Sequence, residues 1–303
     1  MNYSFTVSKE QEQDRIDKCI CDQYEDLSRS YVQRLIEEGA VLYNGKPCKA
    51  NKKVVCNDLI EIDLPDQKIP DIEPENIPLS ILYEDSDVIV IDKPKGMVVH
   101  PANGHYSGTL VNALLYHCKD LSGINGVLRP GIVHRIDRNT TGSVIACKND
   151  FAHNEIAKQL KDHTMNRHYL ALVHGVIKEE SGTVDAPIGR SEKDRKKMAI
   201  NKRNGKDART NYTVVKRYQG YTLVDCRLDT GRTHQIRVHM ASIQHPVVGD
   251  DVYTSQKPPC KLEGQALHAY LLGFNHPRTG EYIEVRSELP AYFTDLLNRL
   301  KPL

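Results

Sequence analysis

Short apolar runs separated by turns dominate the chain beyond residue 80. Four of these runs predict β-strands, because β-branched, aromatic and other apolar residues fill them: residues 88–91, 143–146, 169–173 and 221–224. Residues 109–116 and 151–160 predict helices, with leucine, alanine and isoleucine at helical spacing. The strands outnumber the helices and do not alternate regularly with them, which favours an α+β fold over a doubly wound parallel sheet.

The beginning of the chain follows a different pattern, typical of a small compact domain. Ser28 is a candidate N-cap for a helix that Gly39 would end. Between them, apolar residues recur at helical spacing at Tyr31, Val32, Leu35 and Ile36. A turn at residues 43–47 and a strand at residues 59–62 follow.

The chain has 303 residues, enough for two domains and a well-buried core. Residues 67–78 are rich in proline and acidic residues and contain little to bury, so they predict a linker. We therefore expect a small N-terminal α/β domain at residues 1–66 and a larger domain at residues 79–303.

The composition, with 39% hydrophobic and 27% charged residues, is that of a soluble globular protein. No apolar run approaches the length of a membrane span, and the first residues lack the layout of a signal peptide. Eight cysteines without any C-x-x-C pair predict free thiols in a reducing compartment and make a zinc ribbon unlikely. We expect a cytoplasmic protein without a membrane association.

The segment from His134 to Gly142 carries the strongest chemical signal in the chain. It places one carboxylate, Asp137, between Arg135 and Arg138, just after a short apolar run. A carboxylate flanked by guanidinium groups stays ionised and is held in one orientation. From these residues alone two interpretations remain open: a carboxylate presented for chemistry at the end of a strand, or a polar turn tied down by ordinary ion pairs.

The same nine residues resemble the H-R-L-D-x-x-T-S-G motif of the RluA/RluD-type RNA pseudouridine synthases. Ile136 stands in place of the usual leucine and Thr141 in place of the usual serine. Further blocks match the family in the same order, among them Lys-Pro-Lys-Gly at 93–96, Arg-His-Tyr at 167–169 and Thr-Gly-Arg-Thr-His-Gln-Ile-Arg-Val-His at 230–239. The resemblance covers residues from about 80 to 275.

This resemblance implies a large, mostly antiparallel mixed sheet with a central RNA cleft. It also implies a reaction, the isomerisation of uridine to pseudouridine in RNA. The sugar C1′–N1 bond breaks and C1′ is rejoined to C5 of the same base, so nothing is oxidised or reduced. We therefore expect neither a cofactor nor a metal.

The family's active-site residues fall on Asp137, Tyr169 and Arg237. The resemblance implies that Tyr169 stacks on the flipped base and that Arg237 pairs with the catalytic aspartate. Asp137 could attack C1′ or remove the C2′ proton, and both routes stay open. Further substrate-binding residues are expected at Arg135, Arg138, Arg232 and His134, with Arg232 either a phosphate or a structural contact.

Two basic regions predict additional RNA contacts. The N-terminal segment is similar to an S4 RNA-binding domain, which implies contacts from Arg29, Arg34, Lys46, Lys49, Lys52 and Lys53. The alternative is a small amphipathic domain with solvated charges. Residues 189–210 hold nine Lys or Arg against three acids, among them Arg195, Lys196 and Lys197, although the net charge of the chain is only +1. Such a cluster attracts phosphate, unless it is merely a solvated loop.

Two rival functions belong to other classes. A metal-dependent hydrolase would use the histidines at 134, 234 and 239 with the acids at 250 and 251, but no H-x-H or H-E-x-x-H pattern occurs. A non-catalytic RNA-binding assembly protein is disfavoured by the intact Asp137, Tyr169 and Arg237 set. Large-subunit ribosomal RNA is the expected substrate, with transfer RNA as the alternative, and the chain is expected to be a monomer.

Overall fold

The computed structural model of the protein describes residues 2–24, 27, 29–63, 72–101, 106–124, 129–192, 194 and 197–303. The predicted N-cap Ser28, the first part of the predicted linker (residues 67–71) and the basic residues Arg195 and Lys196 lie outside the described residues. The chain divides into two compact units, Met1–Ile69 and Pro70–Leu303.

The smaller unit packs two helices against an antiparallel sheet. The helices are α1 (Ile16–Gln23) and α2 (Arg29–Glu37), and a short 3₁₀ turn, η1 (Lys9–Gln11), precedes them. The sheet has the order β1-β4-β2-β3, with β1 (Asn2–Thr6), β2 (Val41–Tyr43), β3 (Lys46–Pro47) and β4 (Leu59–Asp63). The helix predicted between Ser28 and Gly39 is confirmed by α2, and the strand predicted at residues 59–62 is confirmed by β4.

The local sequence explains two features of this unit. Val32, Leu35 and Ile36 of α2 are buried together with Ile60 and Ile62 of β4, as their spacings of 3–4 and 2 residues require. The hairpin between β2 and β3 turns at Asn44 and Gly45, which have φ angles of 50° and 74°. Asn-Gly is a favoured pair for such two-residue turns because both residues tolerate positive φ.

Asp17 on α1 is a buried carboxylate that links both helices. It accepts hydrogen bonds from Arg15 (3.0 and 2.9 Å), Arg29 (3.1 and 3.2 Å) and Gln33 (2.6 Å). Burial alone would raise the pKa of Asp17, but the hydrogen bonds from Arg29, Arg15 and Gln33 outweigh it and lower the pKa to about 2. Because this pKa lies below the unfolded value of about 3.9, Asp17 stabilises the fold above pH 4, and this stabilisation is lost as pH falls toward 2.

We therefore expect Asp17→Asn to lower the free energy of unfolding of the smaller unit by about 2 kcal/mol at pH 7. The deficit should shrink as pH falls from 4 to 2, where the wild-type carboxylate also becomes neutral. Urea unfolding of the full chain, followed through NMR signals of α1 and α2, measures this dependence. Asp22→Asn, an exposed acid on the same helix, is the control. A deficit of the same size at every pH would contradict the assignment.

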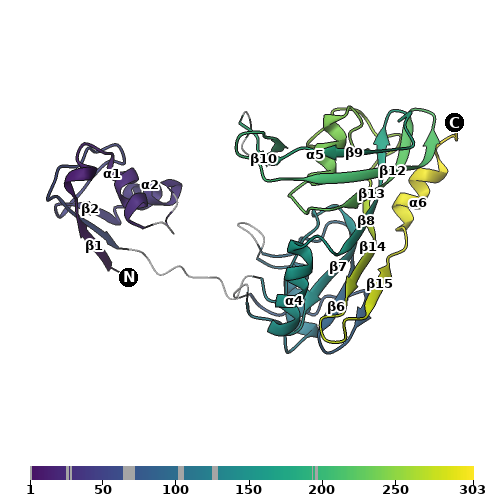
Figure 1. Ribbon diagram of the computed structural model, residues 1–303, viewed down its shortest axis with the longest axis horizontal. Coiled ribbons are helices and arrows are strands. Elements are labelled where there is room, and N and C mark those ends of the chain that lie inside the picture. The colour runs from purple at the N-terminus through teal and green to yellow at the C-terminus, as the bar shows by residue number, and fades with distance from the viewer. Residues whose placement is uncertain are drawn as a thin grey trace. The chain divides into compact units, whose positions relative to one another are not determined.

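The larger unit is built on one nine-stranded sheet, which Figure 1 shows as the long twisted array at the centre of that unit. The order is β5-β6-β7-β14-β8-β13-β12-β9, and β15 also pairs with β14. The strands are β5 (Ile81–Glu84), β6 (Val88–Lys93), β7 (Thr141–Cys147), β8 (Asn166–His174), β9 (Ser181–Asp185), β12 (Arg209–Tyr218), β13 (Tyr221–Leu228), β14 (Leu267–Asn275) and β15 (Tyr282–Arg286).

The pairings within this sheet are antiparallel except between β7 and β14. A separate two-stranded sheet joins β10 (Ile188–Arg190) and β11 (Met198–Ile200). The predicted strands lie inside β6, β7, β8 and β13, and the α+β fold with a mostly antiparallel mixed sheet is confirmed.

Helices cover both faces of the sheet. One face packs on α3 (Leu110–His117) and α5 (Gln235–Ser242), whereas the other packs on α4 (Asp150–Lys161) and α6 (Ala291–Asn298). Figure 1 shows α4 beside β7 and β6, and Ile156 of α4 is buried with Ile145 of β7. All residues of β7 are buried, because both of its faces are covered. In the described part of the chain, no helix is long and apolar enough to cross a membrane.

The helix ends follow from the sequence. The Thr109 hydroxyl accepts a hydrogen bond from the amide of Asn112 (3.3 Å), and the Asn149 side chain accepts one from the amide of Ala152 (2.9 Å). These caps set the starts of α3 and α4, which match the predicted helices within one residue.

The described part of the predicted linker, residues 72–78, packs on the larger unit. Ile72 is buried in the core of that unit, and the amide of Glu75 donates to the Asn112 carbonyl of α3 (2.9 Å). The Glu75 carboxylate accepts from the Gly108 amide at 2.9 Å. This stretch is therefore part of the larger unit, because one apolar side chain and two hydrogen bonds anchor it despite its polar composition.

Candidate active site

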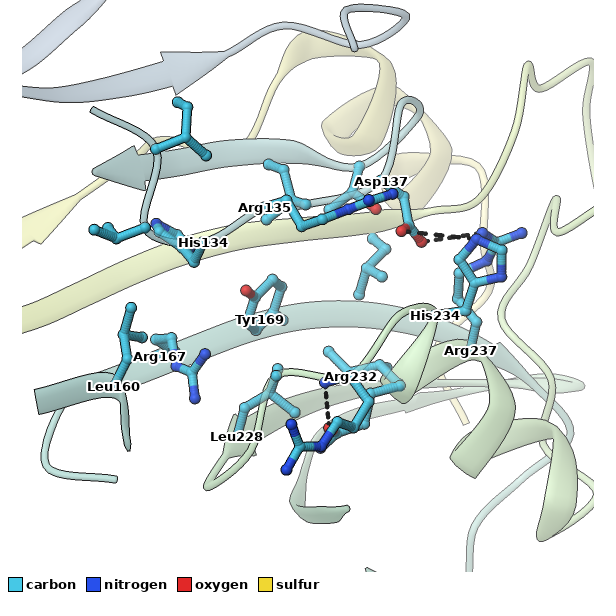
Figure 2. A pocket seen from close by; sticks show the side chains of 18 of the residues that line it. His134, Arg135, Asp137, Leu160, Arg167, Tyr169, Leu228, Arg232, His234 and Arg237 are labelled. Atoms are coloured by element: carbon cyan, nitrogen blue, oxygen red, sulfur yellow. Dashed lines mark hydrogen bonds and ion pairs between the residues drawn. The ribbon is translucent and has the colours of Figure 1, made fainter. Parts of the chain in front are cut away.

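A cavity of about 560 Å³ opens on the face of the sheet that carries α5. The segment before β7 supplies Arg135 and Asp137, β8 supplies Arg167 and Tyr169, and the segment leading into α5 supplies Arg232, His234 and Arg237 (Figure 2). The structure thus brings together the three predicted catalytic residues and the predicted substrate-binding residues His134, Arg135 and Arg232. Arg138 does not line this cavity; its Nε donates to the Gly96 carbonyl at 3.1 Å.

Asp137 lies four residues before Thr141, the first residue of β7 and the point where this strand pairs with β14. Its Oδ2 accepts a hydrogen bond from Nη1 of Arg237 at 3.0 Å, and the side chain of Asp137 is 17% exposed. The expectation that the flanking Arg135 and Arg138 hold this carboxylate is wrong for the described residues. Both arginine side chains are exposed, and the partner of Asp137 comes from 100 residues further along the chain.

The start of β7 requires a glycine. Gly142 has φ 106° and pairs with Ala269 across the parallel β7–β14 contact. A Cβ at this position would overlap the Ala269 carbonyl. Gly142 therefore lets β14 approach the segment that presents Asp137.

Arg237 is held from its other side by Asp250. Its Nε and Nη2 donate to the two carboxylate oxygens of Asp250 at 2.7 and 2.9 Å, and both side chains are at most 5% exposed. Oδ1 of Asp250 also accepts from the amides of Val252 (2.9 Å) and Tyr253 (3.1 Å). Burial would raise the pKa of Asp250, but Arg237 and these amides lower it. The bidentate pair fixes the guanidinium so that Nη1 faces Asp137.

Spacing along the chain does not reveal this role of Asp250, which the hydrolase alternative treats as a metal ligand. It also does not reveal the local role of Lys93 in the Lys-Pro-Lys-Gly block. Lys93 is fully buried, and its Nζ donates to the carbonyls of Pro94 (2.8 Å), Met97 (2.9 Å) and Arg138 (3.1 Å). Burial lowers the pKa of Lys93 to about 7, although Asp137 and Asp92 oppose the shift. Lys93 thereby ties the turn at 94–97 to the residue that follows Asp137.

His134 and His239, two of the histidines that the hydrolase alternative invokes, have structural partners. Nε2 of His134 accepts from the Ile145 amide at 3.0 Å, and burial lowers the pKa of His134 to about 3. His239 is buried between the Thr210 hydroxyl and the Ala186 carbonyl, each at 2.9 Å. In the part of the chain that the structure describes, the groups with metal-ligand spacing lie elsewhere, at Glu84, His117 and Cys118 and at Asp85, Asp87 and His276. The hydrolase interpretation therefore finds no support in this cavity.

His234 is the histidine nearest to the carboxylate. Its Nε2 lies 3.9 Å from Oδ1 of Asp137, and its Nδ1 lies 2.8 Å from the Tyr253 hydroxyl. It has φ 56°, a conformation that is strained for a residue other than glycine, where the chain enters α5. Burial lowers the pKa of His234, and the Asp137 carboxylate opposes this shift.

The basic residues predicted in the smaller unit are exposed. Arg29 combines exposure with its ion pair to Asp17, and Nζ of Lys53 donates to the Gln13 carbonyl at 2.6 Å. Lys46, Lys49 and Lys52 line one open hollow of about 660 Å³, together with Tyr43. In the basic region at residues 189–210, Lys197 is exposed and its Nζ donates to the Val252 carbonyl at 3.0 Å.

Comparison with known proteins identifies the class. Residues 87–242 match the family model of RNA pseudouridylate synthase, and residues 14–60 match the S4 domain. An uncharacterized RNA pseudouridine synthase of Bacillus subtilis is 50% identical over 98% of this chain and 97% of its own length. A ribosomal large subunit pseudouridine synthase D of Zymomonas mobilis is 44% identical over 91% of this chain and 90% of its own length. The human RNA pseudouridylate synthase domain containing 1 superposes with a TM-score of 0.60 at 26% identity, over 76% of this chain and 90% of that one.

The chain therefore belongs to the RNA pseudouridylate synthase family. Within it, the chain is of the RluA/RluD type and has an N-terminal S4 domain. Its reaction is the isomerisation of uridine to pseudouridine in RNA.

Proposed function

We propose that this protein isomerises specific uridines of large-subunit ribosomal RNA and that Asp137 is the catalytic carboxylate. One observation carries the assignment of Asp137: among the described residues that line the cavity it is the one acid, and it lies 3.0 Å from the buried guanidinium of Arg237. Relatives named ribosomal large subunit pseudouridine synthase D, from Zymomonas mobilis and Neisseria meningitidis, support the choice of RNA.

The reaction constrains what Asp137 does. The C1′–N1 bond breaks, C5 takes the place of N1 at C1′, and the C5 proton leaves while N1 regains a proton. Asp137 either attacks C1′ and is displaced when C5 bonds there, or removes the C2′ proton to assist cleavage and returns a proton to C2′ when C5 bonds to C1′. Both routes need the carboxylate held in one orientation, and the ion pair with Arg237 holds it there.

The neighbouring residues hold the nucleotide. Tyr169 is 7% exposed and lines the same cavity, so its ring can stack on the flipped uracil. Arg135 and Arg232, with partly or fully exposed guanidinium groups, contact RNA phosphates around it. His134 is neutral and forms part of the cavity wall. Arg138, which does not line the cavity, contacts the RNA strand beyond it.

We further propose that residues 1–66 form the RNA-docking domain and that the catalytic domain includes residues 72–78, which pack on it, as well as residues 79–303. In the docking domain, the lysines at 46, 49 and 52 bind RNA phosphates. The basic residues Arg29, Arg34, Lys53 and Lys197 extend these contacts. The protein acts as a monomer, since one chain supplies all residues of the proposed site. It acts in the cytoplasm, a reducing compartment in which its eight free thiols persist.

The decisive experiment uses ribosomal RNA and transfer RNA transcripts with tritium at uridine C5, incubated with purified protein without added metal or cofactor. Formation of the C1′–C5 bond expels this hydrogen, so tritium release reports isomerisation. We expect release from large-subunit ribosomal RNA. Release from transfer RNA alone would overturn the proposed substrate, and tight binding of both RNAs without release would support a scaffold.

A further inference from the structure

Arg167 is a buried arginine that projects into the active-site cavity. It lies on β8, two residues before Tyr169, so both side chains point to the same face of the sheet. Arg167 is only 6% exposed, and it lines the cavity together with Tyr169 (Figure 2). It belongs to the Arg-His-Tyr block, yet none of the roles assigned so far involves it.

The guanidinium of Arg167 has few protein partners. Its Nη2 donates to the Asp229 backbone carbonyl at 3.3 Å, and its buried Nε has no hydrogen-bond partner among the described residues. The Asp229 carboxylate is occupied elsewhere, by the side-chain amide of Asn211 at 3.2 Å. Within the described ranges, no carboxylate lies within ion-pair distance of Arg167.

The lack of a carboxylate partner distinguishes Arg167 from Arg237. Both arginines are buried in the same cavity, but Arg237 pairs with the carboxylates of Asp250 and Asp137. A guanidinium remains charged in a protein, and a buried charge without a partner is costly. Arg167 is thus a buried cation whose counter-charge the described residues do not supply.

The surroundings of Arg167 would attract an anion. Five arginines line the cavity, at positions 129, 135, 167, 232 and 237, whereas its described lining contains the single acid Asp137. The backbone of Gly231 closes one side of the guanidinium, since a Cβ there would lie 2.7 Å from Nη1 of Arg167. The unpartnered Nε remains available to a ligand oxygen in the cavity.

We propose that Arg167 binds a phosphate group of the RNA strand next to the uridine that is isomerised. This inference rests on the proposed active site, because it places the uracil at Tyr169. Residues two apart on a strand are about 7 Å apart, so a nucleotide whose base lies at Tyr169 can place an adjoining phosphate at Arg167. A uracil carbonyl could accept a hydrogen bond from Arg167, but it would not neutralise the buried charge.

Salt-dependent binding tests this proposal without relying on turnover. We would titrate a large-subunit ribosomal RNA fragment into the full-length wild type, Arg167→Met and Arg167→Lys at several salt concentrations. Loss of one phosphate contact should weaken binding about tenfold and reduce the slope of log K against log salt by about 0.7. Arg167→Lys should retain the slope. Arg286→Met, which removes an exposed arginine outside the cavity, should leave affinity and slope unchanged.

Thermal unfolding separates binding from a structural role. Because Arg167→Met removes an unpaired buried charge, this variant should be as stable as the wild type without RNA, or more stable. A lower melting temperature together with an unchanged salt slope would overturn the proposal. So would a methionine variant that loses tritium release but keeps the wild-type affinity and slope, since Arg167 would then contact the base.

The failure of the proposed function would look different. If the wild type releases tritium from transfer RNA only, the ribosomal substrate is wrong, and the same titration is carried out with the transfer RNA that is modified. The slope difference between wild type and Arg167→Met decides the role of Arg167 with either RNA.

Discussion

Asp137→Asn is expected to reduce the rate of tritium release by about 10⁴-fold or more. Asparagine keeps the size of the side chain and an oxygen that can accept from Arg237, but it can neither attack C1′ nor remove the C2′ proton. Arg237 keeps its bidentate pair with Asp250, so the fold should persist. Single-turnover release measures the loss, and circular dichroism with thermal unfolding reports the fold.

Asp295→Asn is the matched control, because it removes an exposed acid of α6 that does not line the cavity. It should retain the wild-type rate. An Asp137→Asn protein that is folded, binds RNA and releases tritium within tenfold of the wild type would show that another group performs the chemistry.

The two routes open to Asp137 can then be separated with uridine that carries deuterium at C2′. Removal of the C2′ proton breaks that bond and should slow the single-turnover rate severalfold. Attack at C1′ leaves the bond intact, so the rate should be nearly unchanged.

Asp250→Ala is expected to have the next largest effect, although Asp250 contacts Asp137 only through Arg237. It removes the bidentate partner of a buried guanidinium, and breaking such a pair costs about 3–5 kcal/mol of stability. Freed from Asp250, Arg237 can rotate and no longer holds Asp137 in one position. We expect kcat to fall about 100-fold, because small displacements of a catalytic group have effects of this size.

RNA affinity distinguishes a positioning role of Asp250 from a general loss of structure. Because Asp250 does not line the cavity, affinity for RNA should change little while kcat falls, when both are measured well below the melting temperature. Asp295→Ala, which removes an exposed acid of α6 outside the cavity, should leave kcat unchanged. A parallel loss of RNA affinity and kcat in Asp250→Ala would instead indicate that the cavity collapses.

Many of the helices and strands could be predicted from short stretches of the sequence. The short apolar runs at residues 88–91 and 143–146 identified strands, and the spacing of apolar residues identified α2, α3 and α4. These features depend on neighbours a few positions apart, which is why periodicity and turn chemistry predict them. The proline- and acid-rich composition predicted a linker at residues 72–78, but this stretch packs on the larger unit. Composition does not show this, because the burial of Ile72 depends on a core built from distant residues.

The sequence by itself determined the family motif, the acid at its centre and the elements that carry the site. Only the tertiary structure decided which charges meet. Asp137 has two arginines as chain neighbours but pairs with Arg237, 100 residues away, and Asp250 binds the remaining donors of that guanidinium. The tertiary structure also leaves Arg167 buried without a carboxylate partner among the described residues. Ion pairs form between side chains that packing brings within about 4 Å, and the packing of β7, β14 and α5 cannot be deduced from spacing along the chain.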